Sequence, residues 1–390
     1  MVILSTVILI LAVIYWLIYT VLTSLTIIRV GELTGEYVSD DINYPKVSVI
    51  VAASNEENGL EAATESKLNS DYPDFEIIIV DDRSSDSTPE IIERLKKRNP
   101  NLKNVRIDEL PDGWMGKQNA LNEGVKHANG ELLLFTDADV FYSPDAVKAA
   151  VAHLESNGLD QLGVAASLWG DNFLLNAMFN LFVRTYMVSG RLWAVGWTKF
   201  RPFTGIGGFN LVRRSAFERT EGFDWLKMDL ADDVALGIMI AKHGGKCGVL
   251  GAGDYMTVNW YGSLREMING LERGSYATHG GYSVITGFLS AAIFFVVELA
   301  PVLLMAIGPT PEFRMAGMLL LIMAISVNVA MSKWGHGSIW VGLVYPVCVA
   351  IMAYILVRGA WVGYRRGGII WRDTFYSKEE LKKGQRIRIP

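Results

Sequence analysis

Residues 2–28 contain no charged side chain, and this stretch constrains the fold more than any other feature of the sequence. At ~1.5 Å per residue, a helix of this length exceeds the ~30 Å hydrocarbon core of a bilayer. A cleavable signal peptide would begin with basic residues, and none precedes this stretch. We therefore expect residues 1–29 to form a retained signal anchor that crosses a membrane.

Three further apolar stretches lie near the other end of the chain, at 283–307, 315–332 and 337–357. Each is long enough to span a bilayer. The first contains one acid, Glu298, which is either functional or paired inside the helix bundle. The sequence therefore predicts four parts: the anchor, a soluble domain over 30–281, a C-terminal bundle of three candidate transmembrane helices over 282–358, and a basic tail over 359–390.

The soluble region alternates between two kinds of pattern. Helical patterns, such as Glu56–Asn69 and Lys117–Ala128, separate apolar runs rich in β-branched residues, which lie at 46–53, 75–82, 104–110 and 132–135. Continuous apolar runs of this kind are typical of strands buried in a parallel sheet. The alternation predicts an α/β fold with a doubly wound, Rossmann-like, mostly parallel sheet, which binds ligands at the carboxyl ends of its strands.

Acidic side chains follow three of these strands, at 54–57, at 81–82 and at 137–139. Taken singly, each group is explained by helix capping or by a turn. Three such groups at equivalent positions are harder to explain by chance, because the carboxyl ends of parallel strands share one edge. We therefore expect these acids to lie around one crevice.

Residues 172–197 are apolar enough to resemble another span, but a polar residue recurs at every fourth position from Asn172 to Arg184. A polar stripe along one side favours an amphipathic helix lying in the membrane interface, with a buried core helix as the alternative. A crossing is disfavoured, because the segment lies between acidic groups that are expected to share one site.

The pair Asp137 and Asp139 is suited to a divalent cation. Carboxylates at alternate positions of an irregular turn can reach one ion, and oxygen ligands favour Mg²⁺ or Mn²⁺. Mg²⁺ usually takes one or two protein carboxylates and completes its shell with substrate phosphates and water. A nucleotide diphosphate is therefore the expected partner of this site.

The ordered motifs of the soluble region resemble those of glycosyltransferase family 2, whose members are inverting enzymes of GT-A fold. The resemblance covers about residues 47–276 and rests on "VSVIVAASNEENGL", "IIIVDDRSSDST", "GWMGKQNAL", "LLLFTDADVFYSP" and "DLADDVALG". The "GWMGK" element and the flanking apolar stretches are most similar to the membrane-bound ceramide glucosyltransferase branch and its hopanoid- and carotenoid-associated bacterial relatives. The tail segment "IIWRDTFY" also resembles that branch.

The resemblance implies a role for each donor-side residue. The nucleoside of a sugar nucleotide, most often uridine, would contact Asn55, Glu56, Asp81 and Asp82. The diphosphate would face a second set, consisting of Lys117, the metal-binding pair Asp137 and Asp139, and Arg273. Lysine suits this place because it brings a compact positive charge to a phosphate.

The resemblance also implies an acceptor side. Asp233 matches the general base that deprotonates the acceptor hydroxyl, while Asp232 either shares the acceptor side or caps the following helix. Gly207 and Gly208 belong to a segment in which glycine permits close approach of the backbone to a sugar. One departure is that Gly274 replaces the tryptophan of a (Gln/Arg)-x-x-Arg-Trp motif common among membrane relatives, and this disfavours a processive synthase.

Composition excludes some alternatives. A net charge of −5 argues against a nucleic-acid-binding surface, and two distant cysteines form no metal motif. The five histidines show no paired ligand spacing, and His279 is the one that we would test. Arg29 and Lys46 follow the anchor, which favours a cytoplasmic soluble domain. Three further crossings would leave the tail outside, whereas its nine basic and three acidic residues from Arg358 onward favour the inside.

The sequence thus predicts an integral protein of the cytoplasmic membrane, with its catalytic domain facing the cytoplasm. We expect it to transfer a sugar from a nucleotide diphosphate, UDP-linked, to a lipid hydroxyl with Mn²⁺ or Mg²⁺. Three alternatives stay open: a polyprenyl-phosphate glycosyltransferase, a polysaccharide synthase and an inactive membrane scaffold.

Overall fold

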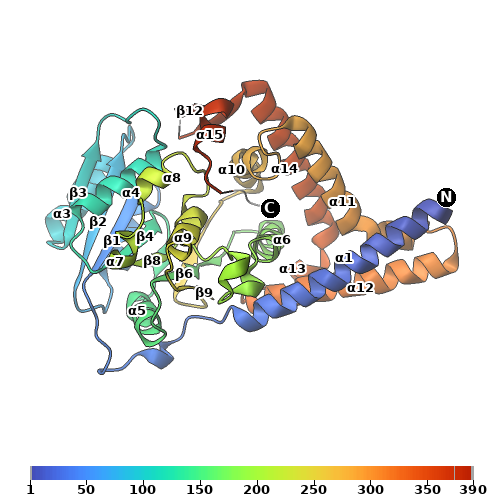
Figure 1. The fold of residues 1–390 in the computed structure, drawn as a ribbon, viewed down its shortest axis with the longest axis horizontal. Coiled ribbons are helices and arrows are strands. Elements are labelled where there is room, and N and C mark those ends of the chain that lie inside the picture. Colours follow the sequence, from blue (N-terminus) through green and yellow to red (C-terminus); the bar gives the residue numbers. More distant parts are fainter. Residues whose placement is uncertain (1, 373, 388–390) are drawn as a thin grey trace.

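The computed structural model describes residues 2–372 and 374–387. An α/β domain lies on one side of the molecule, and long apolar helices extend from it on the other (Figure 1). Residues 1, 373 and 388–390, which belong to the predicted anchor and the predicted basic tail, lie outside the described residues.

A seven-stranded sheet forms the centre of the α/β domain among the described residues. Its order is β3 (Leu102–Ile107), β2 (Phe75–Asp82), β1 (Val47–Ala53), β4 (Leu132–Asp137), β8 (Asn210–Arg213), β6 (Gln161–Ala165) and β9 (Cys247–Gly251). The first four strands run parallel, with Val51 opposite Ile79 on one side and Thr136 on the other. Strand β8 is antiparallel to both of its neighbours. The mostly parallel sheet predicted from the sequence is confirmed.

Helices cover both faces of this sheet, which explains why its strands are apolar without interruption. Val49 and Val51 belong to one buried cluster and Ile50 to the other, since successive side chains point to opposite faces. The covering helices are α2 (Leu60–Leu68), α3 (Thr88–Arg98), α4 (Gly116–His127), α5 (Ala146–Ser156), α7 (Arg214–Phe217), α8 (Phe223–Leu226) and α9 (Asp232–Lys242), with the short 3-10 turn η1 (Gly35–Tyr37) beside them.

A helix beginning at Glu56 was predicted, and this start is wrong, because α2 begins at Leu60. The preceding residues form a loop instead. Asn55 has a left-handed backbone with φ 55°, and the backbone N–H of Glu56 donates to Thr88 Oγ1 at 2.8 Å. Thr88, the first residue of α3, thus binds a backbone donor of this loop.

A second, small sheet lies beside the carboxyl edge of the large one. It contains β5 (Phe141–Tyr142), β10 (Met256–Val258) and β7 (Ser167–Leu168), in that order. Strand β5 follows the Asp-x-Asp pair directly and β10 pairs antiparallel with it. The small sheet therefore fixes the chain just after the acidic turn.

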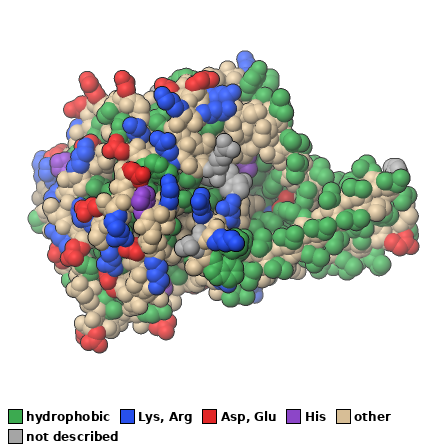
Figure 2. Space-filling model, viewed as in Figure 1, with side chains coloured by type: hydrophobic (Ala, Val, Ile, Leu, Met, Phe, Trp, Pro, Cys, Tyr) green, Lys and Arg blue, Asp and Glu red, His purple; other side chains and the backbone are tan. Residues whose placement is uncertain are grey.

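Four helices in the described part of the chain are long and apolar enough to cross a membrane: α1 (Val2–Arg29), α11 (Val284–Ile307), α12 (Pro311–Trp334) and α14 (Tyr345–Arg366). Figure 2 shows that apolar side chains gather on the part of the surface that extends away from the α/β domain, where α1 and α12 lie in Figure 1. A single turn, α13 (Trp340–Leu343), precedes α14.

Helices α11 and α14 run side by side in opposite directions. Near the start of α11, Gly287 faces Ala360 close to the end of α14. Near its middle, the Tyr345 hydroxyl donates to the carbonyl of Glu298 at 3.5 Å, and Tyr345 is the first residue of α14. Helix α14 therefore begins beside the middle of α11.

The chain after α14 returns to the α/β domain. It forms a hairpin of β11 (Gly368–Trp371) and β12 (Thr374–Ser377) and then α15 (Lys378–Gly384). Beyond α15, the backbone N–H groups of Arg386 and Ile387 both donate to Asp229 Oδ2, at 2.8 and 3.1 Å. The described tail thus lies against the domain that contains the predicted site.

Two helices lie between the α/β domain and the apolar helices, α6 (Phe173–Ser189) and α10 (Leu264–Ala277), and the 3-10 turns η2 (Leu192–Ala194) and η3 (Thr198–Phe200) follow α6. The polar stripe of α6 binds other helices: Asn180 donates to the carbonyl of Asn328, and Arg184 pairs with Glu298 at 2.7 Å. Both members of that pair are fully buried, so Glu298 does pair inside the bundle. The interfacial position of this segment stays a prediction.

Candidate active site

A cavity of about 1230 Å³ opens where β1, β2 and β4 end. Most of the predicted site residues line it, namely Glu56, Asp82, Lys117, Asp137, Asp139, Gly207, Gly208, Asp232, Asp233 and Arg273. Asn55 and Asp81 are the two predicted residues that are not on its wall. The three acidic groups expected to meet at one edge of the sheet therefore do so.

Lys117 is the second residue of α4, and its side chain lies at the centre of the acidic cluster. Its Nζ lies 2.7 Å from Asp137 Oδ1 and 3.7 Å from Asp232 Oδ2. Burial acts to lower the pKa of Lys117, but the surrounding carboxylates outweigh it and raise that pKa above its ordinary value. Gly116 precedes Lys117, and a Cβ there would collide with Asp82, so glycine lets the lysine approach.

Asp137 and Asp139 form the part of the cluster that suits a cation. Burial, together with the negative charges of Asp137 and Glu56, raises the pKa of Asp139 to about 6. No group of three or more His, Cys, Asp or Glu side chains in the described residues is arranged to hold a metal alone. Two carboxylates fit Mg²⁺ or Mn²⁺, because such an ion takes its remaining ligands from phosphate and water.

A buried lysine that the sequence did not single out lies beneath this turn. Lys67 of α2 is 2% exposed, and its Nζ donates to the carbonyl of Val140. Burial lowers the pKa of Lys67 to about 7, although the charges of Asp139 and Asp137 oppose that shift. The side chain thus holds the segment just after Asp139 in place.

Asp232 and Asp233 are the first two residues of α9. Burial raises the pKa of both carboxyls, to about 7 for Asp232, while Lys117 acts to lower them. Asp233 Oδ1 accepts from the backbone N–H of Val234 at 2.8 Å. Asp232 faces Lys117 and does not cap the helix, whose N-cap residue is Ala231. A carboxylate with a raised pKa in a cleft is suited to accept a proton.

The glycine segment 204–208 approaches these carboxylates closely. A Cβ on Gly207 would lie 3.1 Å from Asp137 Oδ2 and 3.3 Å from Asp233 Oδ2. Glycine at position 207 therefore leaves room for the carboxylates and for a sugar that enters beside them.

The two remaining donor-side residues, Asp81 and Asn55, form hydrogen bonds to the loop that follows β2. Asp81 is fully buried, accepts from the backbone N–H of Ser84 at 3.1 Å and pairs with Arg106. Asn55 Oδ1 accepts from the backbone N–H of Ser85 at 2.8 Å. Their contact with a nucleoside stays a prediction, and the structure gives both a loop-binding role in addition.

Sequence reasoning did not assign a role to the C-terminal hairpin, although its resemblance to a known segment was a signal. Trp371 and Arg372 both line the cavity. The Trp371 ring lies 4.2 Å below the guanidinium of Arg273, so an aromatic ring accompanies this arginine even though position 274 is glycine.

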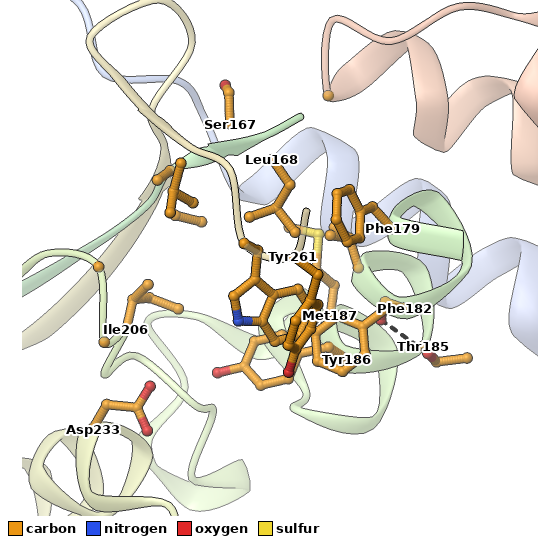
Figure 3. Close-up of a pocket in the computed structure, with 18 of the residues that line it drawn as sticks. Ser167, Leu168, Phe179, Phe182, Thr185, Tyr186, Met187, Ile206, Asp233 and Tyr261 are labelled. Carbon is orange, nitrogen blue, oxygen red and sulfur yellow. Dashed lines mark hydrogen bonds between the residues drawn. The ribbon is translucent and has the colours of Figure 1, made fainter. Parts of the chain in front are cut away.

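The cavity continues from the acids into apolar surroundings. Figure 3 shows Asp233 and Ile206 on one side of it, with Tyr186, Phe182 and Tyr261 across from them. Farther on, the walls come from the apolar helices and include Phe294, Val341, Met352 and Leu356. One cavity therefore joins a charged end to an apolar end.

Parts of this chain are similar in sequence to known proteins. Residues 48–220 match the family model described as Glycosyl transferase family 2. A beta-monoglucosyldiacylglycerol synthase from Synechocystis is 30% identical over 223 residues, which are 56% of this chain and 44% of the relative. A probable glycosyltransferase, YdaM, from Bacillus subtilis is 32% identical over 212 residues, 51% of this chain and 47% of the relative. The chain thus spans about half the length of these curated relatives.

Among solved structures, the mannosyltransferase PcManGT from Pyrobaculum calidifontis, in complex with GDP-Man and Mn²⁺, aligns with a TM-score of 0.51 at 18% identity. The alignment covers 92% of this chain and 99% of that one, and at this identity it shows the fold. The family match, the parallel sheet and the acids at its strand ends agree with the resemblance found in the motifs. Residues 48–220 are a glycosyl transferase family 2 domain, built on the GT-A fold.

Proposed function

We propose that this protein transfers a sugar from a nucleotide diphosphate, UDP-linked, to a hydroxyl group of a membrane lipid. The reaction inverts the anomeric centre and uses Mn²⁺ or Mg²⁺. The observation that carries the proposal is the single cavity, which has Asp233 and Lys117 at its charged end and apolar helices at its other end. Such a cavity suits a water-soluble donor that meets an acceptor still held by the bilayer.

The charged residues suit the two halves of the reaction. Asp233 would take the proton of the acceptor hydroxyl as that oxygen attacks the anomeric carbon. Lys117 would shift from Asp137 toward the departing diphosphate and stabilise its negative charge. Asp137 and Asp139 would hold the divalent ion, which when bound neutralises the diphosphate as the sugar–phosphate bond breaks.

The relatives support a lipid acceptor. The Synechocystis relative and a second one from Trichormus variabilis, 29% identical over 198 residues, are both named beta-monoglucosyldiacylglycerol synthase. The exposed apolar surface on the helices of this chain is what a protein embedded beside such an acceptor requires.

The placement of the helices supports a membrane topology with three crossings, by α1, α11 and α12. The segment from residue 335 to the end of α14 would enter the bilayer from the catalytic side and return to it, because α14 begins beside the middle of α11 and ends beside its start. This arrangement puts the basic tail on the same side as the catalytic domain, and it removes the conflict between three C-terminal crossings and the charge of the tail. With the positive-inside rule, that side is the cytoplasm.

The proposal is tested with the purified full chain in lipid nanodiscs, Mn²⁺, a total lipid extract and a panel of labelled UDP- and GDP-linked sugars. We expect a labelled glycolipid from one UDP-sugar, with no product when EDTA removes the metal. Lys378→Met, an exchange outside the cavity, serves as the control and should retain full transfer. Absence of both labelled lipid and metal-dependent donor turnover across the panel would contradict the proposed function.

A further inference from the structure

The C-terminal hairpin is bound to the donor side of the cavity at several points. The backbone N–H of Gly116, next to Lys117, donates to the Tyr376 hydroxyl at 3.3 Å. Tyr376 itself is 5% exposed, and Leu381 after it is fully buried. Gly367, with φ 69°, turns the chain from α14 into β11. The hairpin is therefore an ordered wall of the site, supplied by the chain that follows the last apolar helix.

Arg372 reaches from this hairpin to the end of β1. Its guanidinium donates to the carbonyl of Ser54 and pairs with the carboxylate of Glu56. Arg372 has a left-handed backbone, with φ 46°, which a residue other than glycine adopts at a cost. The side chain stays 40% exposed and lines the cavity, so part of the guanidinium is still open to a ligand.

A second arginine lies close to the first. Arg273 of α10 stacks on Trp371, and its Nε is buried without a hydrogen-bond partner in the described residues. Burial lowers the pKa of Arg273, and the positive charge of Arg372 lowers it further. Two neighbouring guanidinium groups repel each other, and one of them keeps an unused donor, so an anion bound between them would relieve both costs.

The chemistry of the surrounding wall indicates which anion. Glu56, which holds Arg372, is close enough to Asp139 for its charge to raise the pKa of that carboxyl. The arginine pair therefore borders the turn that is suited to a divalent ion. Arginine binds phosphate oxygens through two parallel N–H donors, and a diphosphate offers enough oxygens for a metal, a lysine and two arginines.

We propose that Arg372 of the C-terminal hairpin, together with Arg273, binds the diphosphate of the nucleotide-sugar donor. This inference rests on the proposed function and extends it to a segment outside the matched family domain. Without donor, Glu56 and Ser54 keep Arg372 in position; with donor, its free N–H groups donate to phosphate oxygens.

The test measures binding of UDP, GDP, UMP and GMP to the purified full chain with Mn²⁺, by isothermal titration calorimetry. Arg372→Met should weaken binding of the preferred diphosphate about ten- to hundredfold, because a charge-assisted hydrogen bond is lost. Binding of the monophosphate should weaken less than about threefold. Arg365→Met is the matched control, an exposed arginine at the end of α14 outside the cavity, and it should bind all four nucleotides as the wild type does.

Two further experiments distinguish direct binding of the donor diphosphate by Arg372 from an indirect role and from binding of a lipid phosphate. Glu56→Gln removes the same ion pair from the opposite side, and it should keep the preference for diphosphate over monophosphate if Arg372 contacts phosphate directly. Nanodiscs containing phosphatidic acid test a lipid phosphate as the ligand, and Arg372→Met should bind them as the wild type does.

Three results would overturn the inference: unchanged diphosphate binding by Arg372→Met, equal losses for monophosphate and diphosphate, or a loss confined to phosphatidic acid. Failure of the wild type to bind any of the four nucleotides would instead refute the nucleotide donor, and with it the proposed function.

Discussion

Lys117 Nζ lies 2.7 Å from Asp137 Oδ1, so the lysine neutralises one of the two carboxylates that are predicted to bind metal. The ammonium group and a divalent ion therefore compete for Asp137 until a diphosphate arrives. Once the diphosphate is bound, Lys117 has a new anionic partner, and Asp137 becomes available to the ion. Metal and donor are thereby expected to bind cooperatively.

Lys117→Met tests this competition. Binding of Mn²⁺ alone should become tighter by about three- to tenfold, because a positive charge beside the carboxylates is removed. Transfer should fall by about 10²- to 10³-fold, since the departing diphosphate loses a donor. Electron paramagnetic resonance titration of free Mn²⁺ measures the first effect. Weaker binding of Mn²⁺ alone to the variant would contradict the competition.

The pH dependence of Lys117→Met tests the electrostatic coupling between Lys117 and Asp233. Asp233 accepts a proton only when it is ionised, so the rate of transfer should fall as the pH drops through its raised pKa. The positive charge of Lys117 lowers the pKa of Asp233, so replacing Lys117 by a neutral residue should raise it.

The acid limb of kcat/KM should therefore move by ~1 unit to higher pH in Lys117→Met. The profile is measured at saturating metal, with Lys378→Met as a control whose limb stays in place. An acid limb that is unchanged or shifted to lower pH would refute the coupling between Lys117 and Asp233.

The buried pair of Arg184 and Glu298 gives a prediction on stability. Both side chains are fully buried, and Arg184 Nη2 lies 2.7 Å from Glu298 Oε1. Glu298→Leu leaves an unpaired charge among apolar helices and should cost about 3–5 kcal/mol of unfolding free energy. The double variant Arg184→Leu with Glu298→Leu should lie near the wild type, because both charges have gone.

Thermal unfolding in detergent micelles measures these changes, with Glu312→Gln as the control. Glu312 lies exposed in the first turn of α12, and its exchange should alter stability by less than about 0.5 kcal/mol. A double variant that is as unstable as the single one would show that the pair has another structural role.

The proposed membrane topology predicts which parts of the chain lie on the same side of the membrane. Glu312→Cys, in the first turn of α12, should react with an impermeant maleimide only from the side opposite the catalytic domain. Lys382→Cys of α15 should react only from the catalytic side. Both variants are made in a background without the two native cysteines and are tested in inverted and right-side-out vesicles. Labelling of both positions from one side would contradict the proposed topology, in which α14 does not cross the membrane.

The sheet and the convergence of the acids were predictable from the sequence, because both follow from local patterns. Val49, Ile50 and Val51 form a continuous apolar run, and such runs are buried on both faces of a parallel sheet. Asp82 and Asp137 end β2 and β4, the parallel strands on either side of β1, so topology alone brings them to one edge.

Other features depend on contacts between distant parts of the chain. The start of α14 beside the middle of α11 has no local signature, since α14, like the other three candidate spans, is long and apolar enough to cross a membrane. Arg184 continues a polar stripe that the sequence assigned to the membrane interface, and only the position of Glu298, 114 residues later, explains its burial. Arg372 reaches Glu56 across 316 residues, a pairing that no local pattern encodes.

The central claim is that Asp233 is the base that activates a lipid hydroxyl, and Asp233→Asn in nanodiscs tests it most directly. Single-turnover transfer from a labelled donor is measured beside binding of the nucleoside diphosphate. The account predicts that transfer falls at least about 10³-fold while nucleotide affinity stays within threefold of the wild type. Near-normal transfer by the variant would contradict it, and would favour an acceptor that is already anionic, such as a polyprenyl phosphate.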